Sequence, residues 1–203
     1  MSITYLDDAV KHLRRDKQMA GIIKKVGEFV PRPVQPREYF QVLTFSIISQ
    51  MLSLKAAATI RERLIQRLKP SKVTPTAMLK LSHEELFSVG LSNTKVRAMH
   101  DLARRTEEKL LPLKQFPKLE NDAIIGHLTD VHGIGRWTAE MFLMFGLVRP
   151  DVWPVDDLGL RAAVKKMDSL TEMPAKVYVT NRGEAYAPYR TVACWYLWQS
   201  LKE

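Results

Sequence analysis

Hydrophobic positions recur at helical spacing along nearly the whole chain, and no segment shows the apolar–polar alternation of a strand. The spacing predicts helices over residues 3–15, 17–29, 39–48, 54–68, 82–90, 93–111, 121–130, 136–146, 157–168, about 173–186 and 189–202. Between the second and third of these, Pro31, Pro33 and Pro36 require a linker that is extended or turning, because proline fixes φ and lacks an amide hydrogen. The sequence therefore predicts an all-α protein.

The predicted helix over 136–146 is apolar on more than one face. Trp137, Met141 and Phe145 form one stripe, and further apolar residues occupy the remaining positions. A helix that is hydrophobic all round is usually buried. Periodicity alone therefore favours Trp137 as an ordinary core residue.

The charge balance is the first feature of composition that changes this picture. The 203 residues include 31 Lys and Arg against 22 Asp and Glu, which gives a net charge of +9. An excess of this size favours a polyanionic partner, because basic side chains that contact phosphates release counterions. The alternative is a basic surface without a specific partner.

Cysteine and histidine usage excludes several kinds of site. With a single cysteine, Cys194, the chain has no intramolecular disulfide and no all-cysteine zinc or iron–sulfur site. The five histidines are isolated and show no ligand-like pairing with Cys or carboxylates.

No apolar run reaches the length of a membrane span, and the N-terminus lacks a signal-peptide core. We therefore expect a soluble, intracellular protein.

Two glycines that flank one apolar residue, Gly133-Ile134-Gly135, precede the helix that begins at Arg136. Glycine allows a sharp turn and a close approach of the backbone to a ligand, and the following helix N-terminus adds amides that favour an anion. Because the preceding segment also has helical spacing, the element is a helix, a hairpin and a helix rather than a Rossmann turn. The sequence predicts a phosphate-binding hairpin, with a simple tight turn as the alternative.

A pair of carboxylates, Asp156 and Asp157, follows Pro154 and precedes an apolar helix. One of the two is explained as the N-cap of that helix, where an aspartate is worth about 1 kcal/mol. The other stands near a helix N-terminus, which keeps a carboxylate ionised. An ionised carboxylate beside a sugar C1′ can stabilise an oxocarbenium ion or activate water.

Five motifs in this order resemble the helix-hairpin-helix DNA glycosylase superfamily, and within it the DNA-3-methyladenine glycosylase II group of alkylation-repair enzymes. The similarity covers roughly residues 38–202. The motifs are Ile-Ser-Gln-Met-Leu-Ser at 48–53, Val-Gly-Leu-Ser-Asn-Thr-Lys-Val-Arg-Ala at 89–98, Gly-Ile-Gly-Arg-Trp-Thr-Ala at 133–139, Asp-Val-Trp-Pro-Val-Asp-Asp-Leu at 151–158, and Pro-Tyr-Arg at 188–190 leading into Trp198.

The resemblance implies a two-lobed helical bundle with a helix-hairpin-helix motif and an active-site cleft between the lobes. Residues 1–37 would add N-terminal helices that pack on one lobe, and 38–203 would form the glycosylase domain. One lobe would comprise about 38–111, and the other 112–203 with the N-terminal helices. The compact all-helical members are the better comparison, because the chain is too short for the additional mixed domain of many bacterial relatives.

By resemblance, the second aspartate of the pair, Asp157, is the catalytic residue, and Asp156 becomes the N-cap. Superfamily members that cut the DNA backbone carry a lysine at the position of Trp137, where it forms a Schiff base with the sugar. The tryptophan implies a monofunctional glycosylase without lyase activity.

The resemblance also implies how DNA is held. The enzyme swings its target nucleotide out of the stack, and Met51 stands where the family inserts an apolar wedge; a Met packed in a helix junction is the alternative. A monovalent cation, Na⁺ or K⁺, would bind the carbonyls of Thr129, Val131 and Ile134, and no other cofactor is expected. The predicted DNA-binding residues are Gly133, Ile134, Gly135, Arg136, Thr138, Lys95, Gln50, Met51, Leu52 and Ser53.

An alkylated purine carries a positive charge, so aromatic faces offer it cation–π attraction. Trp137 and Trp198 match the pocket tryptophans of the family. Met141 departs from the pattern, since a bacterial relative has an aromatic residue there, and this puts base stacking in doubt. Phe45 is assigned to the base pocket, and Tyr39, Phe45 or Trp195 would compensate for Met141, although Trp195 fits the core equally well.

The function that follows is hydrolysis of the N-glycosidic bond of alkylated purines, of the 3-methyladenine and 7-methylguanine type, in double-stranded DNA. The alternatives are a non-catalytic DNA-binding or lesion-recognition protein, and a glycosylase for deaminated or oxidised bases. The expected partner is double-stranded DNA that contains alkylated bases. We expect a monomer that does not bind a membrane and that is located in the bacterial cytoplasm or, if eukaryotic, in the nucleus.

Overall fold

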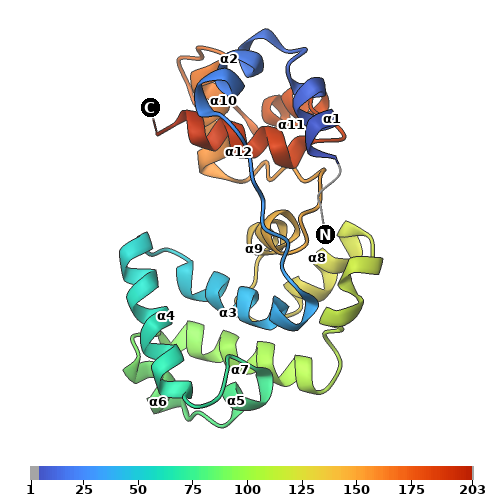
Figure 1. Ribbon diagram of the computed structural model, residues 1–203. Helices are drawn as coiled ribbons and strands as arrows, with labels where there is room; N and C mark the ends of the chain where they lie inside the picture. Colours follow the sequence, from blue (N-terminus) through green and yellow to red (C-terminus); the bar gives the residue numbers. More distant parts are fainter. Residues whose placement is uncertain (1–4, 203) are drawn as a thin grey trace. The chain divides into compact units, whose positions relative to one another are not determined.

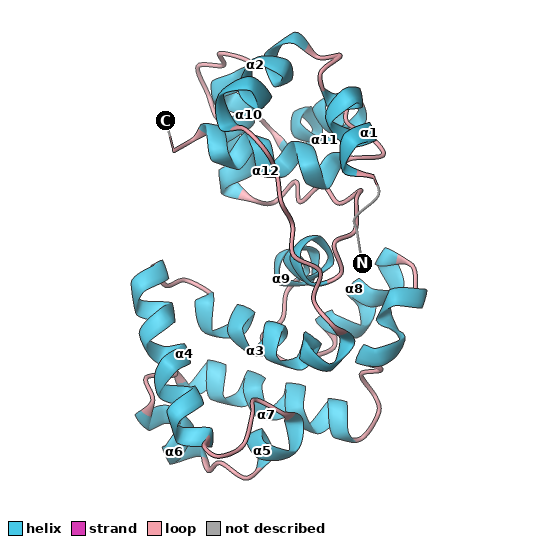
Figure 2. Ribbon diagram, in the orientation of Figure 1, coloured by secondary structure: helices cyan, strands magenta, loops and turns pink. Residues whose placement is uncertain are grey.

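The computed structural model describes residues 5–202, which form helices and loops but no strand (Figure 2). The all-α prediction is confirmed. Figure 1 labels the α-helices. Together with the short η elements, they follow one another as α1 (Leu6–Leu13), α2 (Lys17–Val26), η1 (Pro36–Glu38), α3 (Tyr39–Ser49), α4 (Leu54–Leu68), α5 (Pro75–Leu79), α6 (His83–Ser88), α7 (Asn93–Glu107), η2 (Leu113–Lys118), α8 (Asn121–Thr129), α9 (Arg136–Met141), η3 (Phe142–Gly146), α10 (Leu158–Met167), α11 (Lys176–Glu184) and α12 (Arg190–Ser200).

Most predicted helices are present with shorter ends. Residues 3 and 4 of the first predicted helix lie outside the described residues. Helix α7 ends at Glu107 rather than at residue 111, because Lys109 takes a left-handed φ of 60°. The predicted helix over 136–146 is α-helical only to Met141 and continues as a π-helix, η3. Three short elements, η1, α5 and η2, were not predicted.

The chain forms two compact units. Unit 1 combines the described residues up to Pro33 with those from Leu143 onward, and unit 2 is Val34–Phe142. The sequence placed this division near residue 111, but residues 112–142 belong to unit 2. The reason is local packing, because the Phe142 ring lies 6.0 Å from Phe116 and 5.3 Å from Tyr39 at the start of α3.

Unit 2 is organised around α3 and α7, which lie side by side (Figure 1). Their facing positions are fully buried, including Leu43 and Ile47 on α3 and Val96 and Met99 on α7. Helix α5 covers α7 and α4 follows α3 through a tight turn. This core fixes the start of α7 against the end of α3.

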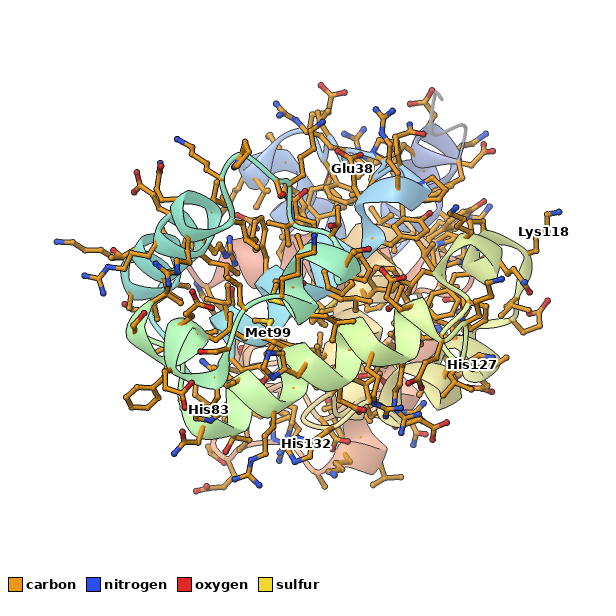
Figure 3. All side chains as sticks on the ribbon, turned by 90° about the horizontal axis from the view of Figure 1, so that it is seen from below. Glu38, His83, Met99, Lys118, His127 and His132 are labelled. Atoms are coloured by element: carbon orange, nitrogen blue, oxygen red, sulfur yellow. The ribbon has the colours of Figure 1, made fainter. Side chains whose placement is uncertain are left out.

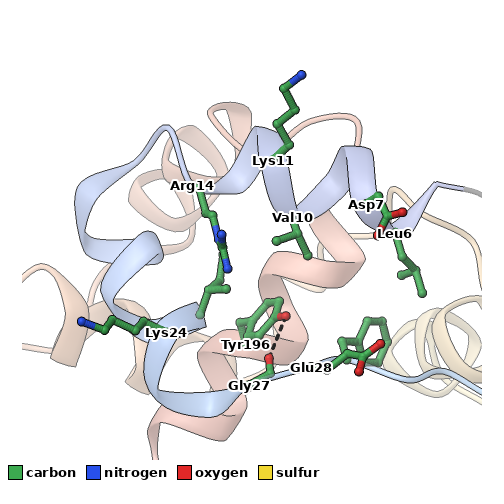
Figure 4. A pocket seen from close by; sticks show the side chains of 11 residues that line it. Leu6, Asp7, Val10, Lys11, Arg14, Lys24, Gly27, Glu28 and Tyr196 are labelled. Carbon is green, nitrogen blue, oxygen red and sulfur yellow. Dashed lines mark hydrogen bonds between the residues drawn. The ribbon is translucent and has the colours of Figure 1, made fainter.

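Unit 1 is built on α12, which is apolar all round. Helices α1, α2 and α10 all pack on it. Tyr196 is fully buried and donates from its hydroxyl to the Gly27 carbonyl (3.0 Å), which ties α12 to the end of α2. Next to Tyr196 lies a cavity of about 1040 Å³ between α1, α2 and α12 (Figure 4). The N-terminal helices therefore complete the core of this unit.

A cluster around Arg182 of α11 ties distant parts of unit 1 together. Its guanidinium donates to Asp16 (2.6 Å) and Asp168 (3.3 Å). Burial alone would raise the pKa of Asp16, but hydrogen bonds from the Met19 amide, from Arg182 and from the Gln18 amide lower the pKa below its usual value. The cluster therefore contributes stability while Asp16 is ionised.

Replacement of Arg182 by Met leaves two partly buried carboxylates without their cation, and we expect it to destabilise the protein by about 3 kcal/mol. At neutral pH this corresponds to a fall in Tm of roughly 8 °C. Because the folded-state pKa of Asp16 is lowered, its stabilisation is present above the unfolded pKa of about 3.9 and is lost as the pH falls through the folded value. Thermal unfolding followed by circular dichroism at neutral pH and at about pH 3 measures both effects.

The matched control for this substitution is Arg15→Met between α1 and α2, where the arginine is exposed and outside the cluster. We expect it to change Tm by less than about 2 °C. Equal effects of the two substitutions, or a difference that persists undiminished at low pH, would contradict the role assigned to the cluster.

Candidate active site

Asp157 lies at the N-cap of α10 in unit 1, and two donors meet on its Oδ1 atom. The Leu160 amide donates over 2.6 Å and the Trp198 indole Nε1 over 2.8 Å. The expectation that Asp156 is the cap was wrong: α10 begins at Leu158, so Asp157 has the capping position. Asp156 instead forms an exposed ion pair with Lys176. The carboxylate chosen as catalytic is thus held in a fixed orientation by one main-chain and one aromatic donor.

The contact between Asp157 and Trp198 depends on a glycine. A Cβ at Gly159 would lie 3.1 Å from both Asp157 Oδ1 and Trp198 Nε1. Such distances are tight for carbon, so a larger residue would push the pair apart. The ring of Phe145, which is 41% exposed, lies 6.0 Å from that of Trp198. Sequence reasoning did not assign Gly159 or Phe145 to the site: Phe145 was noted only in the apolar stripe of the predicted helix over 136–146, and Gly159 belongs to no recognisable local pattern.

The loop that leads to Asp157 is anchored on the start of α12. Arg190 makes a bidentate pair with Asp151, at 2.6 and 2.7 Å. The Thr191 hydroxyl donates to the Arg149 carbonyl (2.6 Å) and accepts from the Val152 amide (3.0 Å). Two of the five motifs, at 151–158 and 188–190, are therefore joined physically. Their pairing sets the direction in which the chain enters α10.

Trp153 fixes the same loop on α11. Its indole nitrogen donates to the Val179 carbonyl (2.8 Å), and its ring lies on Gly183, where a Cβ would come within 2.4 Å of that nitrogen. The indole is 9% exposed. Trp153 is thus a buried structural residue.

The hairpin of unit 2 runs from the end of α8 to α9. Gly133 has a φ of 78°, which favours glycine, and Gly135 is the N-cap of α9. Two amides of the hairpin already have acceptors within the protein. The His132 amide donates to Asp101 of α7 (2.8 Å), and the Ile134 amide donates to the Val131 carbonyl (3.1 Å). Among residues 5–202, no acceptor is found for the amides of Gly133 and Gly135. These two donors are available to a phosphate.

Asp101 of α7 anchors the hairpin by accepting from the His132 amide. Burial acts to raise its pKa, but the hydrogen bond from the His132 amide and those from Arg104 and Arg105 outweigh it, so the pKa is lowered. The carboxylate accepts from Arg104 at 2.6 Å and from Arg105 at 3.0 Å. It remains ionised at neutral pH and keeps the hairpin attached to α7.

Gln50 and Thr138 support the hairpin from within unit 2. The Gln50 side-chain amide donates to the Gly133 carbonyl (3.0 Å) and to the Thr138 hydroxyl (3.1 Å). Thr138 is 3% exposed, and the Ile134 side chain is also buried. These side chains, predicted as DNA contacts, therefore shape the hairpin. The Arg136 side chain is 61% exposed and pairs with Glu140 through Nε (3.0 Å).

The turn between α3 and α4 presents apolar side chains outward. Met51 is fully exposed and has a φ of 55°, and Leu52 is 39% exposed. Ser53 is the N-cap of α4, accepting from the Ala56 amide (3.3 Å). The alternative that Met51 packs in a helix junction is wrong. Lys95, predicted to contact phosphate, donates instead to two main-chain carbonyls near this turn.

The other predicted pocket residues differ in exposure. Trp137 is 43% exposed, so the interpretation as a core residue is wrong, and Met141 is half-buried beside it on α9. Phe45 is half-buried under the Arg61 guanidinium, 5.3 Å away. Tyr39 is buried against Phe142 and therefore does not offer a face for stacking.

Trp195 of unit 1 packs on Phe29, with ring centroids 4.6 Å apart, and lies edge-on to Tyr196 at 5.1 Å. It is half-buried, and its ring contacts join α12 to the end of α2. Trp198 is the aromatic residue of α12 that contacts Asp157.

The carbonyls assigned to a monovalent cation lie at the end of α8 and in the hairpin. Helix C-termini carry partial negative charge, and neutral oxygens suit a hard cation, so the donor set fits Na⁺ or K⁺. The Val131 carbonyl accepts one hydrogen bond from Ile134, which leaves its second lone pair for a ligand. Among residues 5–202, no cluster of three His, Cys, Asp or Glu side chains could hold a metal ion.

The helices of residues 5–202 are either too short or too polar to cross a bilayer.

Residues 45–188 match the HhH-GPD superfamily of base excision DNA repair proteins, and the chain belongs to this family. The family inferred from the five motifs is thus confirmed. The chain is 35% identical to DNA-3-methyladenine glycosylase 1 of Schizosaccharomyces pombe, over 98% of this chain and 90% of that protein.

Solved structures give the same picture. The 3-methyladenine DNA glycosylase Mag1 of S. pombe, in complex with abasic DNA, superposes with a TM-score of 0.86 at 34% identity, covering 97% of both chains. DNA-3-methyladenine glycosidase of Bacillus halodurans superposes with a TM-score of 0.83 at 36% identity, covering 95% of this chain and 88% of that one. These are alkylated-base repair enzymes by name.

Proposed function

We propose that the protein is a DNA-3-methyladenine glycosylase that hydrolyses the N-glycosidic bond of alkylated purines in double-stranded DNA. The observation that carries the proposal is the Asp157 carboxylate at the head of α10, oriented by Trp198 and by the Leu160 amide. Relatives named for 3-methyladenine excision, at 34–36% identity over nearly the whole chain, support the substrate class.

The chemistry suits a cationic base. When the bond between C1′ and the base nitrogen breaks, its electron pair neutralises the positive charge of an N3- or N7-alkylated purine, so the base leaves without a general acid. The sugar develops oxocarbenium charge, which the Asp157 carboxylate stabilises. Water then forms the new bond to C1′, and its proton passes to the carboxylate or to solvent. The products are a free base and an abasic site.

Aromatic faces would recognise the cation. Trp198 touches Asp157, and Trp137 is exposed, so both indoles can offer cation–π attraction to an extruded alkylpurine. Met141 and Phe45 of unit 2 are the further side chains that we assign to base recognition. Because residue 137 is Trp rather than Lys, no Schiff base with the sugar can form there, and the enzyme would leave the DNA backbone intact.

DNA would be held by the hairpin and opened by the 50–53 turn. The Gly133 and Gly135 amides, and the exposed Arg136 side chain, are the donors that we assign to phosphates. Met51 and Leu52 project outward and would fill the gap that the extruded nucleotide leaves. The Thr129, Val131 and Ile134 carbonyls would hold Na⁺ or K⁺, whose charge would add to the attraction for phosphate.

No other cofactor is required for this hydrolysis. An enzyme that acts on genomic DNA is expected where that DNA lies, in the bacterial cytoplasm or in a nucleus. A single damaged nucleotide is a substrate for one copy of the chain, so we propose a monomer.

The test is release of free base from methylated duplex DNA, followed by chromatography. We expect 3-methyladenine and 7-methylguanine to be released and the strand to break only after alkaline treatment of the abasic product. Binding without release would indicate a lesion-recognition protein. If, in a panel of single-lesion duplexes, only deaminated or oxidised bases are released, the substrates are those bases and not alkylated purines.

A further inference from the structure

The C-terminal end of α3 is held by a lysine from another helix. The Lys95 ammonium donates to the Ile48 carbonyl (2.8 Å) and to the Gln50 carbonyl (2.7 Å). Carbonyls at a helix C-terminus lack intrahelical partners and carry partial negative charge, so a cation satisfies them. Lys95 stands in the first turn of α7, where a cation opposes that helix's own dipole. The contacts of Lys95 with the C-terminal end of α3 therefore explain why a lysine stands here, whereas the dipole of α7 does not.

The segment that Lys95 holds needs an external support. Met51 adopts a left-handed φ of 55°, which a residue other than glycine keeps only when its surroundings enforce it. The Met51 side chain is fully exposed, so it makes no packing contact that could enforce the turn. The peptide that precedes Met51 is the one whose carbonyl Lys95 binds. The conformation of Met51 is thus set through its main chain.

The same turn is tied to the hairpin. Gln50 accepts from Lys95 with its main-chain carbonyl and donates with its side chain to Gly133 and Thr138. All of these residues lie in unit 2: Gln50 directly follows α3, Lys95 is on α7, Gly133 is in the hairpin and Thr138 is on α9. Helices α3 and α7 pack side by side (Figure 1). One residue, Gln50, therefore connects the apolar turn to the phosphate-binding hairpin, and Lys95 fixes that residue's backbone.

We propose that Lys95 is a positioning residue that does not bind a DNA phosphate. Through the Ile48 and Gln50 carbonyls, it holds the Met51 turn in a fixed position relative to the hairpin. Its importance for catalysis rests on the proposed glycosylase function, in which Met51 is the wedge. Lys95 is half-buried, and burial lowers the pKa of its ammonium. A wedge held in place before binding avoids the cost of ordering it on DNA.

The first arm of the test is hydrogen–deuterium exchange in the DNA-free protein. Lys95→Met is expected to speed exchange at residues 50–53 and in the hairpin, while α10 in unit 1 is unchanged. Lys118→Met is the matched control, because Lys118 is an exposed lysine of unit 2 whose side chain points outward (Figure 3). Unchanged exchange at 50–53 overturns the holding role. This arm needs no enzymatic activity, so it decides the proposal even if wild-type protein releases no base.

The second arm compares base release with salt-dependent DNA binding. For a positioning residue, Lys95→Met slows single-turnover release about tenfold while the salt dependence of binding to undamaged duplex stays that of wild type. A phosphate contact would instead lower that slope by about 0.9 and weaken binding to all sequences alike. Unchanged release, or a reduced slope, overturns the proposal.

Two further variants keep the test decisive. Lys95→Arg retains charge and donors and is expected to recover most of the exchange protection. If Lys95→Met fails to fold, Lys95→Gln carries both arms, since its polar side chain is one bond shorter and lacks the charge, and exchange at residues 50–53 is expected to be faster than in wild type. Wild-type exchange at 50–53 in Lys95→Gln and Lys118→Met alike would overturn the proposal.

Discussion

Replacement of Asp157 by asparagine is expected to lower the single-turnover rate of base release by at least about 100-fold. Asparagine caps helices as well as aspartate, and its Oδ1 can still accept from the Leu160 amide and the Trp198 indole. The substitution therefore removes the negative charge and leaves the local structure in place. Rate constants from rapid-quench assays on a duplex with one alkylated purine, with protein in excess, give the measurement.

The adjacent Asp156→Asn is the matched control. Asp156 pairs with Lys176 on the surface, and an exposed pair contributes little to stability. We expect this variant to release base within about twofold of wild type. Full activity in Asp157→Asn, or an equal loss in both variants, would show that the charge at the head of α10 does not carry the reaction.

Replacement of Gly133 by alanine is expected to weaken binding to undamaged duplex roughly tenfold. A Cβ makes the φ of 78° unfavourable by about 1–2 kcal/mol, and it would lie 3.0 Å from the Ala98 Cβ on α7. The hairpin must then shift, which moves the Gly133 amide away from the phosphate and disturbs the carbonyl that Gln50 binds. Fluorescence anisotropy with a labelled duplex at fixed salt measures the loss.

The matched control is Gly126→Ala on the preceding helix, α8. Nothing lies within 4 Å of a Cβ there, and alanine favours a helix over glycine by about 1 kcal/mol. This variant should bind DNA like wild type and unfold at an equal or higher temperature. If Gly133→Ala binds DNA as well as Gly126→Ala does, the hairpin is not the phosphate site.

Much of the fold follows from local sequence features. The 3.6-residue period placed most of the helices, because each buries one apolar stripe, and the Gly-x-Gly spacing located the hairpin. Helix α5 could have been found from Thr74 and Pro75, which are its N-cap and first residue. The π-helix at Phe142–Gly146 left no signal in the apolar pattern, since both kinds of helix bury the same residues.

The supports of the site were beyond local reasoning. Whether Asp156 or Asp157 caps α10 depends on a difference of one residue in the helix start, which capping preference alone does not decide. Lys95 reaches carbonyls more than forty positions away in the chain, so its charge suggested a phosphate rather than a helix end. The need for glycine at 159 arises only when Trp198 is brought onto Asp157. Such contacts are set by packing, not by pattern.

The most direct measurement is mass spectrometric analysis of both products from wild-type protein acting on a duplex with a single alkylated purine. The account predicts free alkylated base and a full-length strand that carries an abasic site. Recovery of the intact lesion after prolonged incubation, or a strand cut at the lesion by the protein itself, would contradict it.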